Sequence, residues 1–387
     1  MDVRQIYAAV NAATKQAIGD SVILQENLGN IVDVGTAIMN ARSLDKYVAA
    51  LVDHIGKVLF VDRPYRGEVV SVLRDGAEYG AVLEKIASEM PEAVEDEAWN
   101  LVDGASYDPH VFTQPQVYAK FYDKLAPFEF DRSIADLQAR SGFDNAAQVS
   151  AFTSMLFNDV DKAATKALSE LVLRTINNMT AATLYDYNSG GTYTGAGNTR
   201  AINLLSRYNT QYSKSLAAAD AIYDPDFIRY AAFVMGVTRR RMQSMSKLFN
   251  IGGRVRFTPA DLQHFVLHAD FKAAADVFLQ SGTFNEQFTR LPEAETVSYW
   301  QGSGTGYSFA DTTAINVTDA EGHAVQASGI LGVMFDHDAL GVYNPVGPDR
   351  RVTTQYNPKA EFTNYYFKFA SRYFNDTNEN FIVFYVA

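Results

Sequence analysis

The longest unbroken hydrophobic pattern in the chain lies between Gly142 and Gly190. This stretch contains neither glycine nor proline, and its apolar residues recur every three to five positions, mostly every four. They are Val149, Phe152, Leu156, Val160, Ala164, Leu168, Leu171, Ile176 and Met179. Apolar side chains at this spacing share one face of a helix, and Asp144 is a residue type that caps helix N-termini. We predict one helix of about 40 residues, roughly 60 Å long. A two-stranded coiled coil is the alternative, and the absence of a steady seven-residue repeat disfavours it.

The chain before this helix divides into a helical part and an extended part. From Asp45 to Phe60 the apolar residues lie on one helical face, and Pro64 and Gly67 then interrupt the pattern. From Val117 to Ile134 the pattern is extended, because aromatic and acidic residues alternate around Phe128. We therefore expect a helical arm followed by β structure.

The segment between Ile86 and Ala119 is acidic and apolar at the same time. It contains no lysine or arginine, and its acidic residues are Glu89, Glu92, Glu95, Asp96, Glu97, Asp103 and Asp108. Its larger apolar residues are Trp99, Leu101, Val102, Tyr107, Val111 and Phe112. A solvated loop is one interpretation, but this is much apolar surface to leave in water. The composition favours a hairpin that lies on another subunit, with Glu95, Asp96, Glu97, Trp99, Tyr107 and Phe112 as candidate inter-subunit contacts.

The second half of the chain mixes helices and strands. Helical spacing is clearest from Asp224 to Leu248 and from Pro259 to Leu279, and short strands with Gly and Asn turns follow. The C-terminal end has the pattern of a hairpin, with strands from Tyr365 to Phe374 and from Phe381 to Val386 joined by a turn at residues 375–380. The sequence therefore predicts an α+β fold.

Composition and charge narrow the class of protein. The 387 residues suffice for two or three domains. Acids outnumber bases by 45 to 33, giving a net charge of −12, whereas a nucleic-acid binder needs lysine and arginine in excess. The chain has no cysteine and therefore no disulfide or thiolate site. No apolar run approaches the roughly 20 residues of a membrane span. We expect a soluble protein, made in the cytoplasm, that does not contact a membrane.

Candidate catalytic and metal-binding chemistry is sparse. His264 and His268 are four positions apart on a predicted helix, a spacing that two metal ligands could use, but no glutamate stands between them. Asp336, His337 and Asp338 are adjacent, and adjacent side chains seldom converge on one atom. The glycines around residues 190–197 and 302–306 lack the Lys-Ser/Thr of a phosphate-binding loop. We expect no catalytic, cofactor-binding or metal site.

Arg239, Arg240 and Arg241, with Arg254 and Arg256 beyond them, form the one concentrated basic patch. Three consecutive residues on a helix span about 200°, so these arginines cannot all face one ligand. Subunit contacts, solvent exposure and packaged nucleic acid are the three interpretations. Subunit contact is the one we favour.

The order of these elements resembles that of tailed-phage major capsid proteins of the Hong Kong phage type. Several stretches also resemble capsid proteins of siphophages: Tyr79 to Pro91, Asp224 to Tyr230, Tyr299 to Thr305, Gly332 to Gly341, and Tyr356-Asn357-Pro358 with the aromatic ending. The resemblance covers nearly the whole chain. It implies an N-terminal arm at residues 1–62, an extended hairpin loop at 63–131, a peripheral domain with a spine helix at 132–187, an axial domain at 188–328 and C-terminal peripheral strands at 329–387.

The resemblance also implies function and partners. It implies a homo-oligomer of pentamers and hexamers that forms the icosahedral head around double-stranded DNA, without sequence-specific binding. A scaffolding protein and a portal protein would be the other partners. Two alternatives stay open: an encapsulin-like compartment shell, which shares the fold and encloses a cargo enzyme, and a metal-dependent hydrolase using His264 and His268.

The chain departs from some members of this family in two respects. Some carry a long N-terminal scaffolding segment that a protease removes, whereas here the arm and hairpin use the roughly 140 residues before the long helix. We therefore expect a subunit of nearly full length in the virion and a separate scaffolding protein. Some members also link a hairpin lysine to an asparagine of a neighbour, and the hairpin between Ile86 and Ala119 has no lysine.

Overall fold

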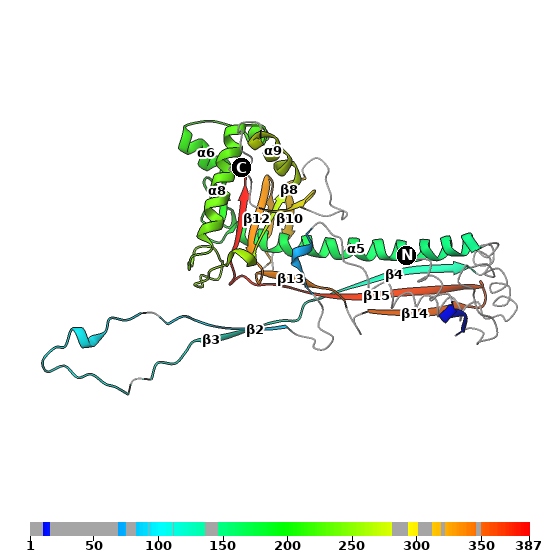
Figure 1. The fold of residues 1–387 in the computed structure, drawn as a ribbon, viewed down its shortest axis with the longest axis horizontal. Helices are drawn as coiled ribbons and strands as arrows, with labels where there is room; N and C mark the ends of the chain where they lie inside the picture. The colour runs from blue at the N-terminus through cyan, green and yellow to red at the C-terminus, as the bar shows by residue number, and fades with distance from the viewer. Residues whose placement is uncertain are drawn as a thin grey trace.

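The computed structural model describes residues 11–15, 69–74, 83–91, 93–110, 112–135, 146–280, 293–300, 312–318, 322–345 and 350–387 (Figure 1). The helix expected at 45–60 and the N-cap expected at Asp144 lie outside the described residues. In the part that is described, no helix is both long enough and apolar enough to cross a membrane.

One long helix, α5 (Ala146–Leu184), runs the length of the molecule's main body (Figure 1). Its 39 residues are continuous, as the sequence pattern predicts, and correspond to about 58 Å at 1.5 Å per residue. Leu171, Ile176 and Met179 from the predicted apolar stripe are buried in one hydrophobic core. The helix contacts strands of both large sheets, so it is the element that holds the two sheets together.

The first sheet lies along α5 and is built around a 14-residue strand, β15 (Phe362–Asn375) (Figure 1). The strand pairs with β4 (Leu125–Ala135), β14 (Arg350–Asn357) and, at its C-terminal end, β13 (Leu340–Tyr343). The short strand β1 (Leu73–Arg74) pairs with β13. Over most of its length β15 alternates buried and half-buried side chains, which fits a sheet with one face against the core.

The second sheet separates two hydrophobic cores. Its order is β7 (Ala201–Asn203), β16 (Phe381–Tyr385), β12 (Ile330–Asp336), β8 (Gln263–His268) and β9 (Glu295–Val297). Alternate residues of the central strands point to opposite faces: Val333 and Val383 join the core around α5, whereas Met334 and Phe384 join the core under the helices above the sheet. Both central strands are buried throughout because both faces are covered.

The helices above the second sheet are α6 (Leu204–Tyr212), α7 (Ala218–Ala221), α8 (Pro225–Arg241) and α9 (Ala269–Gln280) (Figure 1). Helix α8 begins where its sequence has a strong start signal. Asp224 accepts hydrogen bonds from the backbone N–H groups of Asp226 (2.8 Å) and Phe227 (2.9 Å), and Pro225 takes the first helical position. The body also contains two small hairpins, β5–β6 (Tyr185–Asp186, Gly191–Thr192) and β10–β11 (Ile315–Thr318, Ala324–Ala327).

Two of the predicted elements in the second half are wrong. The predicted helix from Pro259 to Leu279 is a 3-10 turn, the buried strand β8 and the helix α9. The predicted C-terminal hairpin does not form, because β15 and β16 belong to different sheets. Strand periodicity shows that both segments are extended, but it does not determine which strand each one pairs with. The helix expected from Asp224 to Leu248 ends earlier, at Arg241.

Candidate functional site: the projecting loop and the ion pairs at its base

A two-stranded hairpin projects from the body of the molecule (Figure 1). Strands β2 (Leu83–Ser88) and β3 (Val117–Tyr122) pair antiparallel, with Leu83 opposite Tyr122 and Ser88 opposite Val117. We call the chain between them, residues 89–116, the acidic loop, and its described parts, 89–91, 93–110 and 112–116, are extended. The following strand, β4, leaves the hairpin at Leu125 and pairs with β15 in the first sheet.

The acidic loop is shaped by short-range hydrogen bonds. Asp96 caps the 3-10 turn at Glu97–Trp99 by accepting from the backbone N–H of Ala98 at 3.0 Å. Asn100 donates to Glu95 at 2.9 Å, and the backbone N–H of Val102 donates to the hydroxyl of Tyr107 at 2.9 Å. These bonds join residues at most five positions apart. The loop therefore has local structure but no packed core of its own.

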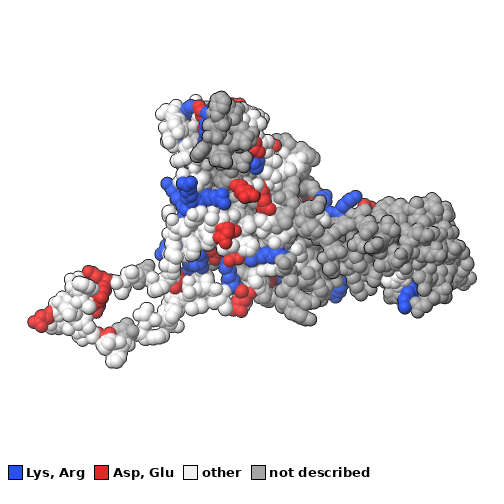
Figure 2. All heavy atoms as spheres, in the orientation of Figure 1, with Lys and Arg blue, Asp and Glu red and all other residues white. Residues whose placement is uncertain are grey.

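The predicted contact residues of the acidic loop are all exposed. Trp99 is 85% exposed, Phe112 82% and Tyr107 40%, and Glu95, Asp96 and Glu97 are exposed as well. Figure 2 shows acidic side chains gathered at the far end of the hairpin, away from the body. Large aromatic side chains in water are costly, at roughly 1.5–3 kcal/mol each relative to burial. This loop is therefore a surface that a partner would stabilise.

The predicted arginines lie at the C-terminal end of α8. Arg239 is half-buried and donates from Nε to the side-chain oxygen of Gln263 at 3.2 Å. Arg240 and Arg241 are exposed. Among the described residues, none of the three forms an ion pair with a carboxylate of the same chain. Within one subunit the structure does not bring the acidic loop to these three arginines, although Arg254 of the predicted patch pairs with Glu89 at the base of the loop.

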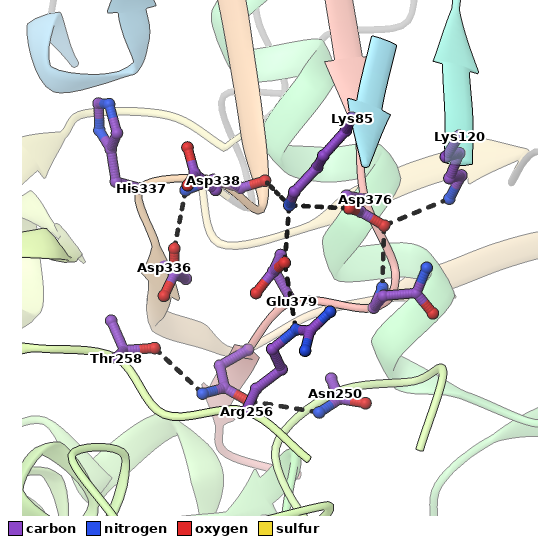
Figure 3. A network of polar contacts seen from close by, with 12 residues as sticks. Lys85, Lys120, Asn250, Arg256, Thr258, Asp336, His337, Asp338, Asp376 and Glu379 are labelled. Carbon is purple, nitrogen blue, oxygen red and sulfur yellow. Dashed lines mark hydrogen bonds and ion pairs between the residues drawn. The ribbon is translucent and has the colours of Figure 1, made fainter. Parts of the chain in front are cut away.

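The base of the hairpin is held to the body by a network of ion pairs (Figure 3). Lys85 of β2 and Lys120 of β3 are directly opposite each other, an arrangement that is unfavourable for two like charges. Asp376 relieves the repulsion because its two carboxylate oxygens bind both ammonium groups, at 2.9 Å from Lys85 and 3.4 Å from Lys120. Glu379 binds Lys85 at 2.7 Å and Arg256 at 3.3 Å. Both acids lie in the turn between β15 and β16.

A second set of contacts secures the same hairpin from the segment that follows α8. Arg254 forms an ion pair with Glu89 and lies over the ring of Tyr118, with 4.7 Å between its guanidinium carbon and the ring centroid. Arg256 donates to the hydroxyl of Tyr118. Next to Lys120, the ring of Tyr122 packs against Phe374 at 5.2 Å between centroids. One face of the hairpin is thus fixed to the body through its charged and aromatic side chains.

Burial and charge act in opposite directions on the ion-pair network. Burial by itself lowers the pKa of Lys85, but its hydrogen bond to Glu379 and the charge of Asp376 outweigh burial, so the pKa is raised. Burial raises the pKa of Asp376, but the charge and hydrogen bond of Lys85 outweigh it, so the pKa is lowered. At Glu379 the effect of burial is larger than that of the hydrogen bond and charge of Lys85, so the pKa of this carboxyl is raised. Asp376 is therefore the acid that the network stabilises in its charged form.

This network was missed at the sequence level. Lys85, Asp376 and Glu379 carry no motif, and Lys85 is 291 positions from Asp376. One signal was available: the only lysines of the hairpin, Lys85 and Lys120, flank a segment that has none. Their symmetrical placement indicates a base that must find negative partners elsewhere in the chain.

The histidine pair considered for metal binding does not form a site. His264 and His268 lie in strand β8 and not on a helix. A strand rises about 3.3 Å per residue, so side chains four positions apart are about 13 Å from each other and cannot share an ion. His264 instead makes a 2.9 Å hydrogen bond to His337. In the described ranges, no three His, Asp or Glu side chains are grouped to hold a metal ion.

Comparison with known proteins identifies the chain's family. The sequence profile of the Phi29-like phage major capsid protein family matches residues 10–385. The chain belongs to this family. The match confirms the resemblance to tailed-phage major capsid proteins, and it favours a phage capsid over a compartment shell. No curated protein sequence matches the chain.

Solved phage structures are similar to this chain, and the one with a TM-score above 0.5 supports the fold. A chain from the structure of the head fiber and inner core protein gp22 of native bacteriophage P68 has a TM-score of 0.54 at 9% identity, covering 84% of this chain and 86% of that chain. The capsid structure of Staphylococcus phage Andhra has a TM-score of 0.48 at 12% identity, covering 82% and 83%. At these identities the likeness concerns the fold alone. The capsid protein has the mixed helix and sheet fold of tailed-phage capsids, and it is a structural component of the virion shell.

Proposed function

We propose that the capsid protein closes its shell by laying the acidic loop of each subunit across an adjacent subunit. The shell would consist of pentamers and hexamers that form an icosahedral head around double-stranded DNA. A separate scaffolding protein would guide assembly in the host cytoplasm, and a portal protein would occupy one vertex. The capsid protein would have no enzymatic activity. Its excess of acids over bases suits a shell that encloses DNA without binding it strongly.

One observation carries this proposal, namely the large apolar side chains that the hairpin exposes. Besides Trp99 and Phe112 in the loop, Ile86, Val117 and Phe121 on the hairpin strands are each more than 60% exposed. The opposite face of the hairpin is the one anchored to the body, so this outward face is available to another molecule. A shell made of many copies of this chain offers such a molecule at every position.

The acids of the loop would set orientation and partner choice more than affinity. The adjacent subunit would present Arg239, Arg240 and Arg241 to Glu95, Asp96 and Glu97. Opposite charges on two surfaces accelerate encounter and disfavour wrong registers, and their effect decreases as salt screens them. Burial of Trp99, Tyr107 and Phe112 would then supply about 1.5–3 kcal/mol each.

Charge reversal tests this proposal. The triple substitution Glu95→Lys, Asp96→Lys and Glu97→Lys should leave a folded subunit that does not form shells, as followed by negative-stain imaging and sedimentation. Adding Arg240→Glu and Arg241→Glu should restore assembly if these arginines are the partners. The neutral set Glu95→Gln, Asp96→Asn and Glu97→Gln is the matched control and should assemble more slowly. Normal assembly of the lysine variant at low ionic strength would show that the loop does not guide assembly electrostatically.

A further inference from the structure

A groove beside the C-terminal half of α8 has an apolar lining and a basic rim. Phe233 and Val237 of α8 line it from one side, and Leu248 and Phe249 of the following segment line it from the other. The lining also includes Arg207 and Arg241. Its volume is about 330 Å³, at the small end of the range for pockets that hold a small molecule.

Two of the lining side chains, Phe233 and Leu248, lie outside the hydrophobic cores of the subunit, whereas Phe249 belongs to one of them. Helix α8 buries a different face, which includes Phe227, Ala231 and Met235, in the core that it shares with α6, α9 and the second sheet. Phe233 is 68% exposed and Leu248 55% exposed, although both are large and apolar. An apolar pocket left open between two exposed side chains is typical of a surface that another molecule covers.

Exposed basic groups on the segments that form this groove are complementary in charge to the acidic loop. Arg240, Arg241 and Lys247 are exposed, and none of them pairs with a carboxylate among the residues whose structure is described. The acidic loop is the complementary surface, with exposed acids around an exposed aromatic ring. The loop of the same subunit extends away from the body (Figure 1), so the complementary loop would come from a second copy of the chain.

We propose that Trp99 of one subunit inserts into the α8 groove of its neighbour, where Glu97 faces Arg241. This inference rests on the proposed function and specifies the contact that joins two subunits. Trp99 is favoured over Phe112 because four acids, Glu95, Asp96, Glu97 and Asp103, stand within four positions of it, whereas the acid nearest Phe112 is Asp108, four positions away. The 3-10 turn capped by Asp96 also presents Trp99 outward, at 85% exposure.

Cross-linking in assembled shells tests the proposal directly, because the chain has no cysteine of its own. Ala98→Cys places a thiol beside Trp99 without removing it, and Gln243→Cys places one just beyond Arg241. A short bismaleimide should join these two positions between subunits and give a dimer band on denaturing gels. The control pairs Ala98→Cys with Tyr223→Cys, an exposed position at the opposite end of α8. That end is about 25 Å away along a 17-residue helix, and this pair should give no dimer.

Filling the groove provides an independent test. Val237→Phe adds bulk inside the groove without adding charge, and Val277→Phe makes the same change on the exposed surface of α9. Fluorescence emission from Trp99 should move to shorter wavelength on assembly, since the other tryptophan, Trp300, is buried already. The shift, or assembly itself, should be lost in Val237→Phe and kept in Val277→Phe.

The outcomes separate this inference from the proposed function. If shells form with an unchanged Trp99 shift in Val237→Phe and without the cross-link at Gln243→Cys, the groove is not the receptor. The loop would then still dock on a neighbour, because its tryptophan becomes buried. If Trp99 emission does not change on assembly of the unmodified chain, the groove and the docking of the loop are both wrong.

Discussion

At the residue scale, the attachment of the hairpin depends on one carboxylate between two lysines. Lys85 and Lys120 would repel each other across the strand pair, and Asp376 binds both. Asp376 is only 2% exposed, so its charge is well shielded from water. The direction in which the hairpin projects therefore depends on a group far from the loop itself.

Substitution at the two acids should have unequal effects. Asp376→Asn leaves Lys85 and Lys120 facing each other without the carboxylate between them. We expect the free energy of unfolding to decrease by about 2–3 kcal/mol. This is less than the roughly 3–5 kcal/mol for a fully buried pair that is broken, because Lys85 keeps its ion pair with Glu379. Glu379→Gln removes a charge that burial disfavours and keeps an acceptor for Lys85. We expect a change within about 1 kcal/mol in either direction. Urea unfolding of the unassembled subunit measures both, and equal losses would contradict the assigned roles.

The same groups set a pH dependence. The pKa of Asp376 is lowered from its ordinary 3.8, so its stabilisation is complete above that value and is lost as pH falls through the lowered pKa. The pKa of Lys85 is raised above its ordinary 10.5, so its contribution is present below pH 10.5 and is lost as pH rises through the raised value. We expect the hairpin to stay anchored from about pH 5 to 10. Proteolysis at the hairpin base across this range should remain slow, and Asp376→Asn should remove the protection.

The paired histidines predict a separate acid sensitivity. Burial lowers the pKa of His264 and of His337, and the positive charge of Arg74 lowers both further. The charge of Glu295 opposes this shift at His264, and the charges of Asp336 and Asp338 oppose it at His337. A lowered histidine pKa means that the unfolded chain takes up protons first, so stability is lost as pH falls below the ordinary 6.5. The loss should be at most about 1.4 kcal/mol per pH unit for each histidine. His337→Asn should flatten the decrease in subunit stability between pH 7.5 and 5, and an unchanged slope would contradict this account.

At the scale of elements, a break in α5 should disturb folding more than a break in any other helix, because α5 contacts both large sheets. Leu171→Pro should prevent folding, since an interior proline costs about 3 kcal/mol or more and the buried leucine side chain is lost in addition. Leu171→Met keeps the volume and should cost less than about 1.5 kcal/mol. Circular dichroism and solubility of the two variants measure the difference. A soluble proline variant with native helix content would show that α5 tolerates a break.

At the scale of the whole molecule, the subunit combines a packed body with a loop that lacks a core. Every hydrogen bond described within the acidic loop is local or exposed, whereas the body buries two hydrophobic cores on either side of the second sheet. Local opening costs little free energy where buried contacts are few. The loop should therefore change its dynamics on assembly more than any element of the body.

Hydrogen exchange measures this difference. In the unassembled subunit the amides of residues 89–116 should exchange within seconds, while those of β12 and β16 stay protected. In assembled shells the loop amides should become protected, because the loop would then lie on a neighbour. The strands of the second sheet serve as the internal control, since their protection should be the same in both states. Equal exchange of the loop in subunits and shells would mean that it has no partner.

The sequence by itself determined the features that depend on neighbouring residues. The uninterrupted apolar spacing between Gly142 and Gly190 predicted α5, because helix formation depends on residues three and four positions apart. The composition of the segment between Ile86 and Ala119 predicted a hairpin that lies on another subunit, and on the single chain its aromatic rings Trp99 and Phe112 are exposed. Helical spacing predicted the start of α8 at Asp224, and the structure shows the local cap that fixes it there.

Only the tertiary structure decided which distant segments meet. The pattern at the C-terminus showed two strands, but their partners are β4, β13 and β14 for one and β7 and β12 for the other, so no hairpin forms. His264 lies on a strand because β8 is enclosed between β12 and β9, a context that the i, i+4 spacing of its histidines does not contain. Lys85 meets Asp376 across 291 positions. Strand pairing and ion pairing are selected by contacts across the whole chain, and a periodicity read over ten or twenty residues carries no information about them.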